Sequence, residues 1–103
     1  MNFEAKLSMG KFCIPECERC KKVVWPPMEF CNHCLGTVSI KEEEGIEGKI
    51  IQFSRQDKQY FCMVEFHKAI RIMASISKTP KIGQVVKISK CGIKDGNYFF
   101  QIN

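Results

Sequence analysis

Two Cys-x-x-Cys pairs limit what this chain can fold into more than any other feature of its sequence. The pairs read CERC and CNHC, and the ten residues KKVVWPPMEF separate them. Each Cys-x-x-Cys turn places two sulfurs on one side of a tight knuckle, and two knuckles complete a tetrahedral site of four sulfurs. We therefore predict one metal ion held by Cys17, Cys20, Cys31 and Cys34. Zinc is the expected ion; iron in a rubredoxin-like site competes with it, because the ligand set alone does not separate the two metals.

The cysteine pattern favours a reducing compartment over a disulfide framework. The chain has seven cysteines, an odd number, and its first ten residues lack the apolar run of a secretion signal. We therefore expect a cytoplasmic protein. Cys13 is expected to be a packed thiol near the site, with a redox or ligand-exchange role as the alternative. Cys62, on a predicted strand, and Cys91, at the end of a predicted strand, are expected to be small buried apolar residues. His33 is expected to be a surface residue of the second knuckle.

Several features argue against catalysis and against a membrane span. Four protein thiolates close the coordination sphere of a metal, so hydrolytic chemistry is disfavoured and a structural role is expected. The sequence lacks a Gly-rich phosphate loop and a nucleophile–base pair, and it has only two histidines. We therefore expect that the chain is not an enzyme. Its longest apolar runs span a few residues, so no transmembrane helix is predicted.

Composition changes along the sequence divide the chain into four predicted parts. Residues 1–11 place apolar side chains at near-helical spacing, which predicts a short helix that ends at Gly10. Residues 12–41 are predicted to form a rubredoxin-like zinc ribbon. Residues 42–48, EEEGIEG, are a predicted connector, and residues 49–103 a predicted five-stranded OB-fold barrel. The expected fold class is therefore mainly β.

The barrel prediction rests on five runs rich in β-branched and aromatic residues. They are KIIQFS, YFCMVEF, AIRIMASI, QVVKIS and NYFFQIN. In the third run, every second residue from Ile70 to Ile76 is apolar, as a strand with one buried face requires. Asp95-Gly96 predicts a hairpin turn before the last run. Five antiparallel strands with a longer connection between the third and the fourth fit an OB-type Greek key, whose closure removes exposed edges.

In this order, the parts resemble the acyl-CoA-associated zinc-ribbon/OB-fold family. IPECERCKKVVWPPMEFCNHC resembles its ribbon, EGKIIQFS its connector and first barrel strand, and VEFHKAIRIMASISKTPKIGQVVKI its middle strands. The resemblance covers nearly the whole chain. It implies a non-catalytic scaffold subunit that associates with thiolase-fold enzymes or hot-dog-fold hydratases acting on acyl-CoA. A similar protein bridges acetoacetyl-CoA thiolase and hydroxymethylglutaryl-CoA synthase, with its barrel near the passage of the CoA thioester.

Four residues depart from the family's pattern. Lys21 stands where a glycine commonly follows the first knuckle, which costs up to about 1 kcal/mol if its φ is positive. Met28 replaces a common arginine that could contact a phosphate or a partner carboxylate. Asn32 replaces a common proline, and Ile46 a common glycine. The candidate contacts to a partner or to CoA are Lys21, Lys22, Trp25 and Met28 in the ribbon loop, and Arg71 in the barrel.

Trp25, which precedes the two prolines between the knuckles, has a structural and a functional interpretation. It could cover the metal site or join the ribbon to the barrel. It could instead anchor a partner protein, since exposed tryptophans often do so. The structural interpretation is favoured.

Single-stranded nucleic-acid binding is the alternative function. The formal net charge is +5, and a divalent ion with four thiolates lowers it to about +3. The lysines are spread along the chain rather than clustered, and the third barrel strand offers one outward cation, Arg71, so this alternative is disfavoured. Electron transfer at an iron centre is a further alternative. A red protein would support it, and a colourless protein with stoichiometric zinc would exclude it.

Overall fold

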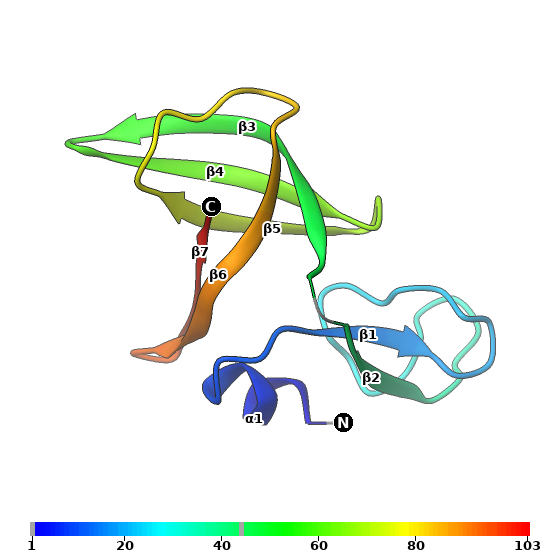
Figure 1. Ribbon diagram of the computed structural model, residues 1–103. Coiled ribbons are helices and arrows are strands. Elements are labelled where there is room, and N and C mark those ends of the chain that lie inside the picture. Colours follow the sequence, from blue (N-terminus) through cyan, green and yellow to red (C-terminus); the bar gives the residue numbers. More distant parts are fainter. Residues whose placement is uncertain (1, 44) are drawn as a thin grey trace.

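The computed structural model describes residues 2–43 and 45–103, and it confirms the predicted fold class, a mainly β chain with one short helix. The strands form a two-stranded sheet in the cysteine-rich ribbon and a closed five-stranded barrel (Figure 1). The elements are α1 (Phe3–Ser8), β1 (Cys13–Cys17), β2 (Val38–Glu42), β3 (Glu47–Gln56), β4 (Gln59–Phe66), β5 (Ile70–Ile76), β6 (Val85–Lys94) and β7 (Asn97–Ile102). Among the described residues, no helix is long and apolar enough to cross a membrane.

The barrel has the strand order β3-β4-β5-β7-β6 and closes where β6 pairs with β3. Its other neighbours pair antiparallel, as predicted, but β5 and β7 are parallel, so the prediction of five antiparallel strands is wrong for this pair. The reason is topological. The connection after β5 crosses to β3, β6 runs antiparallel to β3, and the β6–β7 hairpin returns β7 in the direction of β5.

Alternating side chains along the strands build the apolar core of the barrel. On β5 the four apolar residues at alternate positions from Ile70 to Ile76 are buried, and Arg71 between them is exposed, as predicted. Register shifts at Ile51 in β3 and at Ser89 in β6 are β-bulges, which bend the two strands that close the barrel. Each large apolar side chain buried here contributes about 1.5–3 kcal/mol to stability.

Tight turns join the strands of two of the three barrel hairpins, β6–β7 and β4–β5. Asp95 and Gly96 have φ values of 52° and 79°, so both are positive, as a type I′ turn between β6 and β7 requires. His67 and Lys68, between β4 and β5, also have positive φ values of 52° and 57°. β6 continues up to its turn and is therefore longer than the run predicted at residues 84–89.

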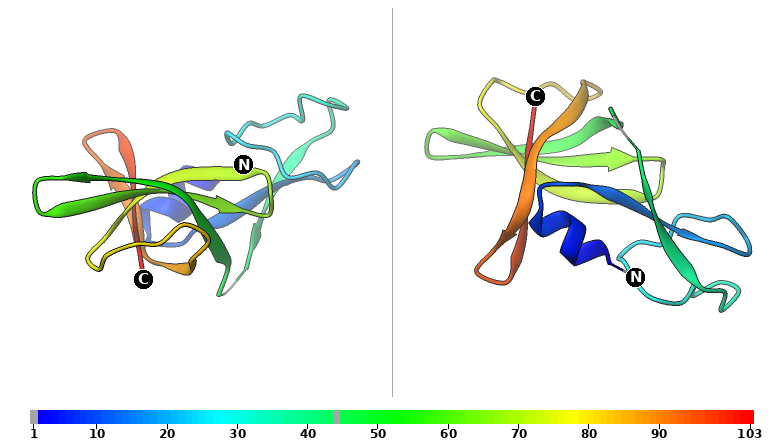
Figure 2. Two further views of the ribbon diagram at one scale, coloured as in Figure 1. Left: turned by 90° about the horizontal axis from the view of Figure 1, so that it is seen from above. Right: turned by 60° about the horizontal axis from the view of Figure 1, so that its bottom comes forward.

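The N-terminal helix is part of the barrel core. α1 has six residues and is too short to be stable alone. Its buried residues Phe3 and Leu7 join the core of the barrel, and the helix lies against β1 and β6 (Figure 2). The helix ends just before Gly10, whose φ is +82°. The N–H groups of Gly10 and Lys11 donate to the carbonyls of Leu7 and Lys6, which is a Schellman motif.

The ribbon is joined to the helix and the barrel by core and surface contacts. Its strands β1 and β2, which the sequence did not predict, pair antiparallel. Ile14 of β1 is 2% exposed and belongs to the same core as the barrel. Lys6 Nζ of α1 donates to Glu42 Oε1 at the end of β2 (2.9 Å), and His67 Nε2 lies 3.0 Å from Glu43 Oε2 just after β2. These contacts fix the orientation of the ribbon on the barrel.

Candidate metal centre

The structure brings the four predicted cysteines together in the ribbon. The Sγ atoms of Cys17, Cys20, Cys31 and Cys34 all lie within 4.8 Å of one another. Cys17 Sγ is 3.4 Å from Cys34 Sγ, and Cys20 Sγ is 3.8 Å from Cys31 Sγ. Sulfurs bound at about 2.3 Å around a tetrahedral ion are about 3.8 Å apart. The group could therefore hold a zinc or an iron ion, with four protein ligands and no open position.

Backbone N–H groups that point at two of the sulfurs favour the thiolate form that a metal binds. The N–H of Cys20 donates to Cys17 Sγ, and the N–H of His33 donates to Cys31 Sγ, both at 3.4 Å. The N–H of Cys20 is the main cause that lowers the pKa of Cys17 to about 6. The N–H groups of Cys34 and His33 lower the pKa of Cys31. The ribbon backbone therefore prepares these two thiols for a cation.

Cys20 shows why the four thiols need a cation to ionise together. The backbone N–H of Lys22 lowers the pKa of Cys20. Burial and the three neighbouring thiols raise it by more, so that the pKa of Cys20 is about 11. A fourth thiolate is unfavourable beside the others because like charges repel. A divalent ion at the centre removes this repulsion, and binding then releases the remaining protons.

The residue that follows each Cys-x-x-Cys pair has a left-handed backbone. Lys21 has a φ of 64° and Leu35 a φ of 63°, and their N–H groups donate to Cys17 O (3.0 Å) and Cys31 O (2.9 Å). The two knuckles therefore share one local geometry. A side chain at such a position costs up to about 1 kcal/mol relative to glycine, so Lys21 carries the strain considered for it from the sequence.

Gly36 allows the two knuckles to approach each other closely. A Cβ atom at this position would lie 2.9 Å from Cys17 Sγ, which is closer than real Cβ contacts, and 3.3 Å from Cys34 Sγ, which is tighter than most of them. The sequence reasoning missed both Leu35 and Gly36. The available signal was the glycine two residues after the second pair, since a glycine beside a cysteine knuckle often marks a close backbone approach.

The remaining cysteines and His33 lie outside the metal-binding group. Cys13 is buried on β1, and burial raises its pKa, which matches a packed thiol better than a reactive one. Burial also raises the pKa of Cys62 and of Cys91. Cys91 lies within β6, not at the strand end where the sequence placed it. His33 is exposed on the second knuckle, with Nε2 3.3 Å from Lys22 Nζ.

The candidate partner contacts are distributed over both modules. Lys21, Lys22 and Met28 are exposed on the ribbon. Arg71 lies on the outer face of β5, where its Nε donates to Glu65 Oε2 at 3.1 Å. These residues therefore belong to two surfaces, one on the ribbon and one on the barrel.

Trp25 has a different position from the other candidate contacts. It is half-buried, and its ring centroid lies 5.7 Å from that of Phe3 and 6.2 Å from that of Phe12. Phe12 in turn lies 5.6 Å from Phe100 of β7. Trp25 thus connects the ribbon loop to the helix and the barrel, which is the structural interpretation of this residue.

The fold of the chain is similar to those of solved structures, whereas its sequence matches no family model. No curated protein matches the sequence either. The Ltp2-ChsH2(DUF35) aldolase matches with a TM-score of 0.70 and 16% identity, over 96% of this chain and 90% of that chain. The chain has the DUF35 fold. A DUF35 family protein of unknown function from Sulfolobus solfataricus matches with a TM-score of 0.69 and 15% identity, over 99% of this chain and 83% of that chain.

The DUF35 fold extends over the ribbon as well as the barrel, because both matches cover almost the whole chain. At 15–16% identity the likeness concerns the fold. Together with the group of four cysteines, it confirms at the level of the fold the zinc-ribbon/OB-barrel resemblance recognised in the sequence.

Proposed function

We propose that this chain is a non-catalytic accessory subunit of a cytoplasmic enzyme complex that processes acyl-CoA substrates. One observation carries the proposal. Over 96% of its length, the chain has the fold found in the Ltp2-ChsH2(DUF35) aldolase, and that name joins a DUF35 chain, ChsH2, to a second protein, Ltp2. The sequence resemblance supplies the acyl-CoA context.

The metal-binding group supports a structural role within such a complex. Four cysteine ligands leave no coordination position for water or substrate, so a bound zinc ion would supply rigidity to the ribbon rather than Lewis-acid chemistry. The residues around the ion then present a fixed surface. Rigid surfaces bind partners with a smaller loss of conformational entropy than mobile ones.

Exposed apolar side chains on both modules also support an accessory role. On the ribbon these are Met28 (37% exposed), Phe30 (59%) and Leu35 (77%). On the barrel they include Met73 (54%), Val85 (53%) and Ile82 (63%). Apolar groups that gather on a surface often mark protein interfaces. Exposed apolar side chains on both modules suit a chain that contacts more than one neighbour.

In the most specific form of the proposal, the chain bridges acetoacetyl-CoA thiolase and hydroxymethylglutaryl-CoA synthase. The ribbon, with Lys21, Lys22 and Met28, binds one enzyme, and Trp25 holds the ribbon loop in place. The barrel, with Arg71, binds the other enzyme or borders the passage of the CoA thioester. The contribution to the reaction is geometric, because two active sites held close together raise the effective concentration of the intermediate at the second site.

Affinity purification from a nuclease-treated native extract, followed by reconstitution with the recombinant partners, tests the proposal. We expect an acyl-CoA enzyme of the thiolase or hydratase class to bind stoichiometrically in size-exclusion chromatography. Recovery of ribosomal or RNA-processing proteins, together with salt-sensitive binding to single-stranded oligonucleotides, would contradict it.

Two matched variants separate the contributions of the modules. Phe30→Glu places a charge on the exposed ribbon surface, and Ile82→Glu places the same charge on the exposed barrel loop. If the chain bridges two enzymes, each variant loses a different partner and retains the other. If both variants lose the same single partner, the chain does not bridge.

One observation favours the second candidate function, binding of single-stranded nucleic acid. Near their connecting turn, β3 and β4 carry an aromatic pair, Phe53 and Tyr60, with ring centroids 6.4 Å apart, and the Arg55 guanidinium lies 5.9 Å from the Tyr60 ring. Half-exposed aromatics beside a cation are the elements on which bases stack. Under this function, Phe53→Ala should weaken oligonucleotide binding and leave the accessory partners bound.

A further inference from the structure

Among neighbouring strands of the barrel, β5 and β7 have the fewest register pairs. One register pair, Ser75 with Gln101, connects these parallel strands, whereas each of the other neighbouring strand pairs of the barrel has at least three. Beside this pair is a cleft of about 790 Å³. The cleft falls in the range of sites that hold ligands of moderate size.

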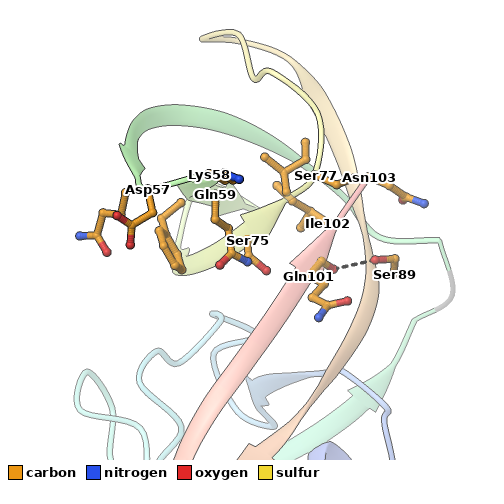
Figure 3. A pocket seen from close by; sticks show the side chains of 12 residues that line it. Asp57, Lys58, Gln59, Ser75, Ser77, Ser89, Gln101, Ile102 and Asn103 are labelled. Carbon is orange, nitrogen blue, oxygen red and sulfur yellow. Dashed lines mark hydrogen bonds between the residues drawn. The ribbon is translucent and has the colours of Figure 1, made fainter.

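The cleft is lined by uncharged polar side chains from all five strands of the barrel (Figure 3). Amide and hydroxyl groups come from Gln56, Gln59, Ser75, Ser77, Ser89, Gln101 and Asn103. Asp57 and Lys58 at the β3–β4 turn have opposite charges, and Phe61 adds an apolar surface. Amide side chains donate and accept hydrogen bonds as peptide groups do, so the lining is chemically suited to a neutral ligand rich in such groups.

Beyond the Ser75–Gln101 pair, the backbone that leaves β5 beside the cleft is open to an additional strand. Ser77, directly after β5, makes no backbone hydrogen bond with the described residues. Ser77 carries no charge, and the lysine and proline that commonly protect a strand edge follow only after it, at Lys78 and Pro80. A free strand edge next to a neutral polar cleft is a suitable template for β-strand addition.

We propose that this cleft binds an extended, uncharged segment of a partner polypeptide, which adds along the backbone at Ser77, where the chain leaves β5. The inference rests on the proposed function in one respect, namely that the partner enzyme supplies the segment. The backbone of the segment would pair with the backbone at Ser77, and the amides of Gln59 and Gln101 would hydrogen-bond to its remaining peptide groups. The phosphates of a nucleic acid would meet a single lining cation, Lys58, whose charge Asp57 offsets.

The test uses short random peptides displayed on phage and selected on the full metal-loaded chain. We expect the enriched peptides to be uncharged over their central residues. Binding of a synthetic enriched peptide, measured by calorimetry, should weaken about tenfold in Ser77→Pro, which removes one backbone donor. Ser77→Ala keeps that donor and should bind like the wild type. Gln101→Lys, at an exposed position in the cleft, should also weaken binding, because a lysine disfavours strand addition.

Thermal unfolding of each variant establishes that it is folded before binding is compared. Equal peptide affinity in the wild type, Ser77→Pro and Gln101→Lys would overturn the proposal, as would a failure to enrich any uncharged peptide. Displacement of the peptide by a thymidine oligonucleotide would also overturn it, in favour of a nucleic-acid site. These outcomes leave the accessory-subunit function intact, because that function is tested by co-purification and by the Phe30→Glu and Ile82→Glu variants.

Discussion

The ribbon and the barrel of this protein are stabilised in different ways. In the part of the chain that the structure describes, the barrel, with α1 and Ile14 of β1, has a core of 15 buried residues, all apolar or cysteine. The ribbon has a cluster of four buried residues, and two of these, Cys17 and Cys31, belong to the metal-binding group. A cluster this small buries too little apolar surface to stabilise a module, and small modules of this kind usually require a metal or disulfides.

This difference explains which residues each module needs. The barrel needs an alternating pattern, which many sequences can supply with different apolar residues. The ribbon needs particular residues at particular positions, namely its four cysteines and Gly36.

Removal of the metal should have the largest effect and should be confined to the ribbon. Cys20→Ser, or a strong chelator, should unfold the ribbon, since metal binding supplies about 10–16 kcal/mol in small zinc modules. Acidification should do the same, because protons compete with the metal for the thiolates. NMR spectra should lose the dispersed ribbon signals and keep those of the barrel, and metal analysis with visible spectroscopy should distinguish colourless zinc from red iron.

Cys13→Ala is the control for the metal prediction, since Cys13 is buried outside the group of four cysteines. This variant should retain one ion per chain. A ribbon that keeps dispersed NMR signals without metal would show that its small apolar cluster is sufficient, and the contrast between the two modules would then fail.

A large-to-small substitution in the barrel core should destabilise the barrel and leave metal binding by the ribbon intact. Phe66 is fully buried, and its ring fills the space beside Gly48, where a Cβ atom would lie 2.7 Å from it. Phe66→Ala should therefore lower the free energy of unfolding by about 3–5 kcal/mol. Denaturant unfolding measures this loss. Phe53→Ala, at a residue that is 39% exposed, should cost clearly less.

Metal content tests whether the barrel defect spreads to the ribbon. Phe66→Ala should bind one ion per chain under conditions in which the variant is folded, because the cysteine knuckles do not contact this core. Loss of metal affinity in this variant would show that the ribbon depends on the barrel, and the two modules would then have to be treated as one cooperative unit.

The sequence predicted the parts of both modules that depend on spacing. The cysteine pairs, the alternation on β5, the Asp95-Gly96 turn and the end of α1 before Gly10 all follow from local geometry, and the structure has them. Local patterns say little about which distant segments become neighbours. The parallel pairing of β5 with β7 follows from the path of the whole chain, so the assumption of five antiparallel strands failed there.

The ribbon strands were missed for a related reason. β1 and β2 pair residues such as Cys13 and Glu42, which are far apart in the sequence, and neither segment has a clear alternating pattern. Leu35 was missed because left-handed backbone is unusual for leucine; the knuckle geometry imposes it. The cleft beside β5 also depends on long-range topology, since it lies where two strands meet at a single register pair.

A smaller change should sharpen the description of the ribbon knuckles. Lys21→Gly relieves a side chain at positive φ and should stabilise the ribbon by up to about 1 kcal/mol. The matched control is Lys22→Gly, since Lys22 is also exposed and does not have positive φ. Competition with a chelator and thermal unfolding should show tighter metal retention only for Lys21→Gly. If Lys21→Gly instead loses the metal to the chelator more readily than the wild type, the Lys21 side chain makes a stabilising contact.

The smallest expected effect concerns the ion pair at the boundary between the two regions. Lys6 of α1 donates to Glu42 of β2, and this hydrogen bond, followed by the charges of Lys6 and Lys11, lowers the pKa of Glu42. A lowered carboxyl pKa means that the pair stabilises the fold above the usual glutamate range and that this contribution disappears as the pH falls through the lower folded value. Because both side chains are partly exposed, solvent weakens the interaction.

An NMR titration of the Glu42 carboxyl measures this effect without unfolding the protein. In Lys6→Met the Glu42 pKa should rise toward its ordinary value, whereas in Lys11→Met it should rise less, because Lys11 Nζ is 3.9 Å from Glu42 Oε1 and Lys6 Nζ is 2.9 Å away. Added salt should reduce the difference between the variants. If the pKa of Glu42 is ordinary while Lys6 is present, the ion pair contributes little to stability. The core around Phe3 and Ile14 is then the contact that holds the ribbon on the barrel.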